Sequence, residues 1–101
     1  MGLTEEQSHY LRILGHDLAP VVDIGAGGVT NSLIKQIDRA LAHHELVKVR
    51  VPFGDKRRRS KVFEQLAPLA GAQLLPSASN CCLLYRPAEE PMILLPGHGA
   101  L

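Results

Sequence analysis

Two short motifs in this chain have the residue types and the spacing to bind phosphate groups. The first is a glycine-rich tetrapeptide, made of Gly25, Ala26, Gly27 and Gly28. It lies between a predicted strand and a predicted helix, where free backbone N–H groups attract anions and where glycine lets a phosphate approach closely. Thr30 replaces the last glycine of a dinucleotide fingerprint, and Val29 replaces the lysine of a P-loop. What remains is G-x-x-G, with which KH-type domains clamp a nucleic-acid backbone; a simple tight turn is the alternative.

The second motif is a run of cations at the predicted start of a helix. It consists of Lys56, Arg57, Arg58 and Arg59. Positive charges in a first helical turn oppose the helix dipole and cost roughly 0.3–1 kcal/mol each at low salt. When a sequence goes against such a local preference without compensation, a function is indicated. Contacts with phosphates would be such a function for these cations. The alternative is a solubilising loop.

The net charge conceals a strong polarisation along the chain. The whole sequence has a net charge of +1, which by itself argues against a nucleic-acid binder. Residues 31–63, however, contain nine Lys or Arg against three Asp or Glu, a net of +6, and both flanks are net acidic. A middle third this basic indicates an anionic partner.

We expect six cations to neutralise phosphates beside the glycine loop. They are Lys35, Arg39, Lys48, Arg50, Arg57 and Arg58. With two Phe, two Tyr and no Trp, the chain offers little on which bases could stack. We therefore expect recognition of backbone and shape, with modest sequence specificity.

Other reactive side chains do not form a recognisable catalytic or metal site. His43 and His44 are neighbours, so they lack the i, i+4 spacing with which a helix chelates zinc. Cys81 and Cys82 are also adjacent and lack C-x-x-C spacing. We expect no catalysis, no metal and no cofactor.

The periodicity of the sequence predicts the elements that carry these residues. A helix over about 4–16 is capped by Thr4, and a second helix over about 30–44 follows Thr30. A third helix follows Asp55 and stops near Gly71. Strands are predicted at 21–24, 46–51, 74–75 and 81–85, with a turn at 77–80.

The order α-β-α-β-α-β-β predicts an α/β fold with a sheet covered by helices. In the strand at 46–51, hydrophobic and basic residues alternate, so we expect a half-buried strand with Lys48 and Arg50 on its exposed face. We assign residues 1–87 to one domain. We expect residues 88–101 to be an extended or disordered tail, of which 93–95 could dock on the body.

Residues spread from the N-terminus to Pro87 form a pattern that is more specific than the glycine loop. They are Leu3, Thr4, Gln7, Leu11, Arg12, Leu14, His16, Leu18, Pro20, Val21, Val22, Gly25, Gly28, Thr30, Ala40, Leu41, His44, Glu45, Leu46, Val47, Lys48, Val49, Gly71, Ala72, Leu84, Tyr85, Arg86 and Pro87. This pattern closely resembles the bacterial YhbY family, the stand-alone form of the CRM domain (chloroplast splicing and ribosome maturation). The resemblance implies three helices on a four-stranded mixed sheet, similar to the C-terminal domain of translation initiation factor three.

The resemblance also implies a function. Members of the family bind RNA, and the bacterial ones associate with precursors of the large ribosomal subunit. By this resemblance residues 25–28 form the RNA-contacting loop. The chain departs from the family in a less basic first helix and in Asp23, which would repel a phosphate if it were exposed.

We therefore expect a monomeric RNA-binding protein that assists assembly of the large (50S) ribosomal subunit. Its partner would be ribosomal RNA or the pre-50S particle, and we expect no binding to DNA. We expect no binding to a membrane, because no apolar stretch approaches the ~20 residues of a span. The N-terminus lacks the basic start of a secretory signal, which favours the cytoplasm. Two alternatives stay open: an adaptor whose basic face binds an acidic protein, and a small enzyme using Cys81 or Cys82 with a histidine.

Overall fold

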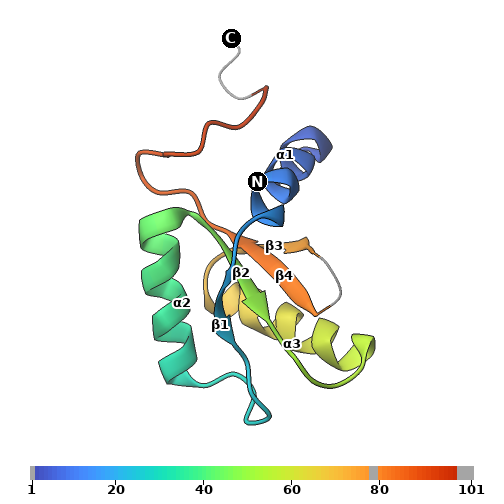
Figure 1. Ribbon diagram of the computed structural model, residues 1–101. Coiled ribbons are helices and arrows are strands. Elements are labelled where there is room, and N and C mark those ends of the chain that lie inside the picture. The colour runs from blue at the N-terminus through green and yellow to red at the C-terminus, as the bar shows by residue number, and fades with distance from the viewer. Residues whose placement is uncertain (1, 78–79, 98–101) are drawn as a thin grey trace.

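The computed structural model describes residues 2–77 and 80–97 as three helices and four strands (Figure 1). In chain order the elements are α1 (Glu5–His16), β1 (Pro20–Asp23), α2 (Asn31–His44), β2 (Leu46–Arg50), α3 (Lys56–Leu69), β3 (Gln73–Pro76) and β4 (Cys81–Tyr85). The predicted order and fold class are confirmed. The turn predicted at 77–80 falls partly on residues 78–79, which lie outside the described residues.

Each helix begins directly after the polar residue that the sequence indicates as its cap. The Thr4 hydroxyl accepts from the Gln7 N–H at 3.1 Å, and the Gln7 side chain accepts from the Thr4 N–H at 3.0 Å, which completes a capping box. Thr30 accepts from the N–H of Leu33 at 3.1 Å, and Asp55 accepts from the N–H of Arg58 at 2.9 Å. These bonds satisfy N–H groups that a helix start leaves without a partner, so the sequence itself sets where the helices begin.

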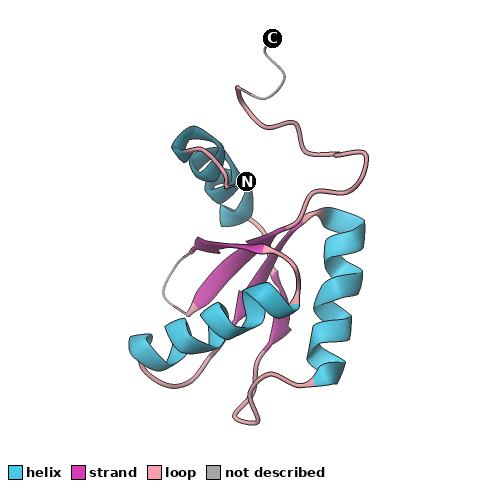
Figure 2. Ribbon diagram, turned by 180° about the vertical axis from the view of Figure 1, so that it is seen from behind, coloured by secondary structure: helices cyan, strands magenta, loops and turns pink. Residues whose placement is uncertain are grey.

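The sheet has the strand order β1-β2-β4-β3. β1 and β2 are parallel, whereas β2 pairs antiparallel with β4 and β4 antiparallel with β3. Helices α2 and α3 cover one face, and α1 lies against the other (Figures 1 and 2). Because β1 and β2 run in the same direction, their carboxyl ends meet at one edge of the sheet. The segments that follow them, residues 24–30 and 51–55, therefore leave the sheet at the same end.

The two faces of the sheet bury cores of different size. The larger core lies under α2 and α3 and includes Ile37, Leu41 and Leu66 on the helices, with Val47 and Val49 on β2. The smaller core lies under α1. It contains Leu11, Leu46, Leu75, Leu83 and Tyr85.

Helix α1 comes close to the sheet at Gly15, where a Cβ would lie 2.5 Å from the Leu83 side chain. Helix α1 covers only part of this face of the sheet. Leu46 is 5% exposed and Lys48 is 9% exposed, whereas the Arg50 side chain, at the carboxyl end of β2, is 42% exposed.

The chain after β4 is held on the body by Glu45, which lies between α2 and β2. Its carboxylate is fully buried and accepts from the backbone N–H groups of Ala88, Met92 and Ile93, at 2.6, 2.9 and 2.8 Å. Burial by itself would raise the pKa of this carboxyl, but the three N–H donors together hold the pKa below its ordinary value. The tail thereby brings Ile93 and Leu95 against the smaller core. No helix in the described part of the chain is long and apolar enough to cross a membrane.

Candidate nucleic-acid interface

The glycine loop lies at the carboxyl end of β1 and leads into α2, at the lower end of the molecule in Figure 1. It is a tight turn, because the N–H of Gly28 donates to the carbonyl of Gly25 at 2.9 Å, and Gly28 has a φ of +75° that favours glycine. A Cβ built on Gly25, Gly27 or Gly28 would meet nothing within 4 Å. The loop is therefore both a tight turn and an open backbone surface that a phosphate could approach.

Exposed cations begin α3 at the same end of the molecule. Lys56, Arg57 and Arg58 occupy its first turn, and all three are exposed. Arg59 differs, because its guanidinium donates to the Gly54 carbonyl and so folds back onto the preceding loop. The first turn of α3 thus presents three cations to solvent, and no ion pair holds them among the described residues.

The two cations predicted on α2 lie on its exposed surface, one turn apart. Lys35 is in the second turn, close along the helix to the glycine loop. Arg39 is farther from the loop and lines a shallow groove beside β1 with Val21, Val22 and His43. Of this pair, Lys35 is the better placed to contact a ligand held at the loop.

The two cations predicted on the exposed face of β2 are both held by partners inside the protein. The prediction of an exposed side chain is wrong for Lys48, which is buried and donates through Nζ to the carbonyl of His16 at 3.2 Å. Arg50 is partly exposed, and it donates Nε and one terminal nitrogen to the Asp23 carboxylate at 2.9 and 2.7 Å. The physical reason is the position of α1 over this face and the alignment of Asp23 with Arg50 in the parallel pair β1–β2.

The same ion pair changes the expected role of Asp23. The hydrogen bond from Arg50, opposed by desolvation and reinforced by the charge of Arg50, lowers the pKa of this carboxyl. Asp23 therefore remains ionised at neutral pH, but the bidentate guanidinium largely neutralises its charge. Asp23 is therefore not an isolated acid that would repel a phosphate beside the loop.

Two features of the structure were not predicted from the sequence. One is the buried Glu45, a residue with a φ of +65° at the end of α2, where glycine or asparagine is usual. The other is a cleft beside α1 into which His9 and Arg12 face. The i, i+3 spacing of His9 and Arg12 would place both on one side of the predicted helix, and this was the available signal.

No histidine among the described residues lines the pocket that contains Cys81 and Cys82. Burial, together with the neighbouring Cys81, raises the pKa of the Cys82 thiol to about 12, so the thiol is protonated at neutral pH. Cys81 is partly exposed, and its Sγ contacts the side chain of Asn80. Within residues 2–77 and 80–97, no group of three His, Cys, Asp or Glu could hold a metal ion.

Comparisons with known proteins agree on one family. The family described as the CRS1 / YhbY (CRM) domain matches residues 3–86. The chain is 35% identical over 94 residues to an "RNA-binding protein" of Haemophilus influenzae, which covers 93% of this chain and 95% of that one. It is 36% identical over 88 residues to the "Probable RNA-binding protein YqeI" of Bacillus subtilis, covering 87% of this chain and 92% of that one.

A solved structure has the same architecture. The solution structure of the hypothetical protein SAV1595 from Staphylococcus aureus superposes with a TM-score of 0.81 at 34% sequence identity. The match covers 94% of this chain and 100% of that one. Sequence and fold therefore lead to the same group of proteins.

Proposed function

This chain belongs to the CRS1 / YhbY (CRM) domain family, and we propose that it is an RNA-binding protein that acts without catalysis. The names of its bacterial relatives support RNA as the partner. The observation that carries the proposal is the open backbone turn at residues 25–28, which lies at the same end of the sheet as three exposed cations. Together they offer a phosphate chain both hydrogen-bond donors and positive charge.

In the mechanism we propose, the loop and the start of α2 hold one phosphate of the RNA. Thr30 satisfies the N–H of Leu33, the third residue of α2, which leaves the first two N–H groups of the helix to bind an anion. Lys35, Arg57 and Arg58 neutralise the neighbouring phosphates, and Arg39 extends the positive surface along α2. Arg50 contributes at this edge of the sheet only where RNA competes with its partner Asp23, and Lys48, which is buried, is not part of this contact.

We propose further that the RNA belongs to the precursor of the large ribosomal subunit, and that the protein assists assembly as a cytoplasmic monomer. The assignment follows from the resemblance of residues 1–87 to the bacterial YhbY proteins. Phosphate contacts fix position but carry no base information, so recognition depends on the shape of the RNA. A structured ribosomal RNA fits such a surface better than a stacked single strand.

Substitution of Gly27 tests the loop. Gly27 has no positive φ and open space at its Cβ position, so both Gly27→Asp and Gly27→Ala should fold. The carboxylate of Gly27→Asp would face the phosphate, and we expect it to weaken binding to a large-subunit ribosomal RNA fragment by about tenfold or more. Gly27→Ala adds the same Cβ without charge and should stay within about twofold of wild type. Equal affinities for the two folded variants would show that the loop does not contact phosphate.

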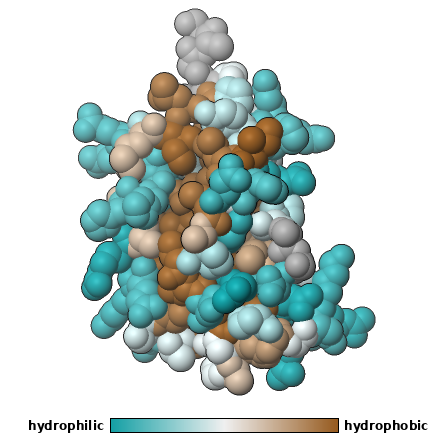
Figure 3. Space-filling view, viewed as in Figure 1, coloured by the Kyte–Doolittle hydropathy of each residue, from teal (hydrophilic) through white to brown (hydrophobic). Residues whose placement is uncertain are grey.

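A protein adaptor is the second candidate, and one observation favours it. Figure 3 shows an apolar strip along the side that carries β1. Leu14, Leu18 and Val21 line part of it beside Ile93, and each of the first three is more than a third exposed. Exposed apolar patches often mark protein contacts. Salt separates the two candidates, because binding through phosphates weakens steeply as salt rises, whereas binding through an apolar strip does not.

A further inference from the structure

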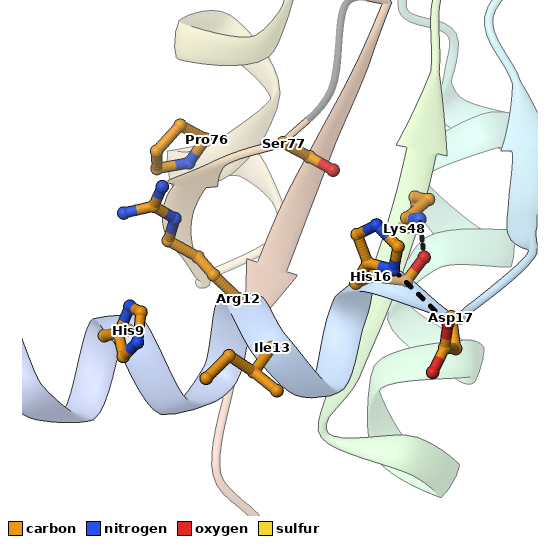
Figure 4. A pocket seen from close by; sticks show the side chains of 8 residues that line it. All are labelled: His9, Arg12, Ile13, His16, Asp17, Lys48, Pro76 and Ser77. Carbon is orange, nitrogen blue, oxygen red and sulfur yellow. Dashed lines mark hydrogen bonds and ion pairs between the residues drawn. The ribbon is translucent and has the colours of Figure 1, made fainter.

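A cleft of about 630 Å³ lies between α1 and the open half of the sheet, on the face opposite α2 and α3 (Figure 4). His9, Arg12 and His16 line it from α1, and Lys48 reaches into it from β2. Pro76 and Ser77, at the end of β3, form the opposite wall, and Arg12 extends toward it. The cleft therefore has cations on two elements and a hydroxyl on a third.

Lys48 is the unusual member of this cleft. It is 9% exposed. Its ammonium has three N–H donors, and one of them donates to the carbonyl of His16. No carboxylate lies within ion-pair distance of it in the described part of the chain. A buried cation without a counter-charge is costly unless a ligand or water completes its shell.

The acid that lines the cleft does not supply a counter-charge for Lys48. Asp17 lies on the rim of the cleft with its side chain 95% exposed, and its carboxylate contacts the Nδ1 atom of His16 at 3.3 Å. Arg12 is exposed and has no ion pair among the described residues. Lys48, beside His16, and Arg12, which extends toward Pro76, therefore give the cleft positive charge at both of its ends without a carboxylate to pair with.

We propose that this cleft binds a second phosphodiester group of the RNA, at a site separate from the glycine loop. The inference rests on the proposed function, because it takes RNA to be the ligand. Lys48 and Arg12 attract the phosphate from the two ends of the cleft, the Ser77 hydroxyl offers a hydrogen bond, and Ile13 and Pro76 provide apolar walls for a ribose. The bound RNA then continues from the carboxyl edge of the sheet onto its open face.

Lys48 also has a structural role that a test must separate from binding. Its ammonium lies on the carbonyl of His16, the last residue of α1, where a cation stabilises the negative end of the helix dipole. Loss of Lys48 can therefore weaken the docking of α1 without any effect on a ligand. Arg12 has no such role, so it provides the second variant.

The experiment compares substitutions that remove the charge with substitutions that keep it at the same position. Arg12→Gln and Lys48→Gln remove one cation each, whereas Arg12→Lys and Lys48→Arg are the matched controls. Inorganic phosphate is titrated into each protein and followed through backbone amide NMR signals. The affinity for a large-subunit ribosomal RNA fragment is then measured at several salt concentrations.

We expect phosphate to shift the amide signals around Arg12, His16 and Lys48 in the wild type and in both charge-keeping variants. These shifts should vanish in the Gln variants. The Gln variants should also bind RNA several-fold more weakly and lower the slope of log K against log salt by about 0.7–0.9, the value for one lost phosphate contact.

Two results would overturn the inference. One is shifts with free phosphate that leave RNA affinity and salt slope unchanged in the Gln variants, which would mean an adventitious ion only. The other is the absence of cleft shifts in the wild type. Gly27→Asp distinguishes this inference from the proposed role of the loop, because that variant should lose RNA affinity but keep the phosphate shifts of the cleft.

Discussion

The charged residues in and directly before β2 lie close in sequence to the charged residues at the start of α3, but the two groups are used differently. Glu45, Lys48 and Arg50 all bind partners within the protein: the tail, the end of α1 and Asp23. The cations of the first turn of α3 face solvent and oppose the dipole of their own helix. The location of a charge in the sequence therefore shows neither whether it stabilises the fold nor whether it is free to bind a ligand.

The largest effect on stability is expected at Glu45. Glu45→Gln replaces a carboxylate that accepts three N–H bonds by an amide with one acceptor oxygen, so at least one of the part-buried N–H donors loses its acceptor. We expect a loss of about 2–3 kcal/mol in the free energy of unfolding, measured by urea denaturation. Glu64→Gln, an exposed change on α3, is the matched control and should stay within about 0.5 kcal/mol. Equal stability of the two variants would show that Glu45 does not hold the tail.

The opposite pattern is expected for the cations of α3. Replacing both Arg57 and Arg58 by Glu should lower RNA affinity by about tenfold or more, because two attractive charges become repulsive. The same change places acids in the first turn, so the free energy of unfolding should rise by roughly 0.3–1 kcal/mol per residue. Binding assays and urea denaturation on one sample measure both effects. A variant that loses stability, or that binds RNA as well as wild type, would contradict the assignment of these cations to the ligand.

A smaller effect is expected from the pair Asp23–Arg50. Asp23→Asn removes the counter-charge of Arg50 and leaves a partly exposed guanidinium beside the glycine loop. RNA affinity should rise about two- to threefold at low salt, and the gain should disappear at high salt. Arg50→Gln provides the comparison and should change affinity little. If Arg50→Gln weakens binding as strongly as a substitution of Arg57, then Arg50 is a free RNA contact and does not differ from the cations of α3.

The sequence predicted what depends on neighbouring residues and missed what depends on distant ones. Thr4, Thr30 and Asp55 cap helices through bonds to residues three positions away, so the pattern alone located the helix starts. The burial of Lys48 depends on α1, which lies 32 residues from it at the contact with His16. Alternation in a strand distinguishes its two faces, but it cannot show that a helix covers the second face as well.

The parts of the candidate site that are local in sequence were predictable, whereas the parts that the fold brings together were not. The glycine loop and the start of α3 are local motifs, and the structure places both at the carboxyl end of the parallel pair β1–β2. The buried role of Glu45 could not be predicted from its neighbours, because its three N–H donors come from residues more than forty positions later. The cleft beside α1 depends on three separate elements, so only the folded chain brings Arg12, Lys48 and Ser77 together.

An NMR titration of the full chain with a large-subunit ribosomal RNA fragment at moderate salt tests directly whether RNA binds at the carboxyl edge of the sheet. We expect the earliest and largest amide shifts at residues 25–32 and 56–58, with the amide of Glu45 and its neighbours in the tail unaffected. A response confined to the apolar strip around Leu18 and Val21, with no shift in the glycine loop, would contradict the claim that RNA binds at the carboxyl edge of the sheet.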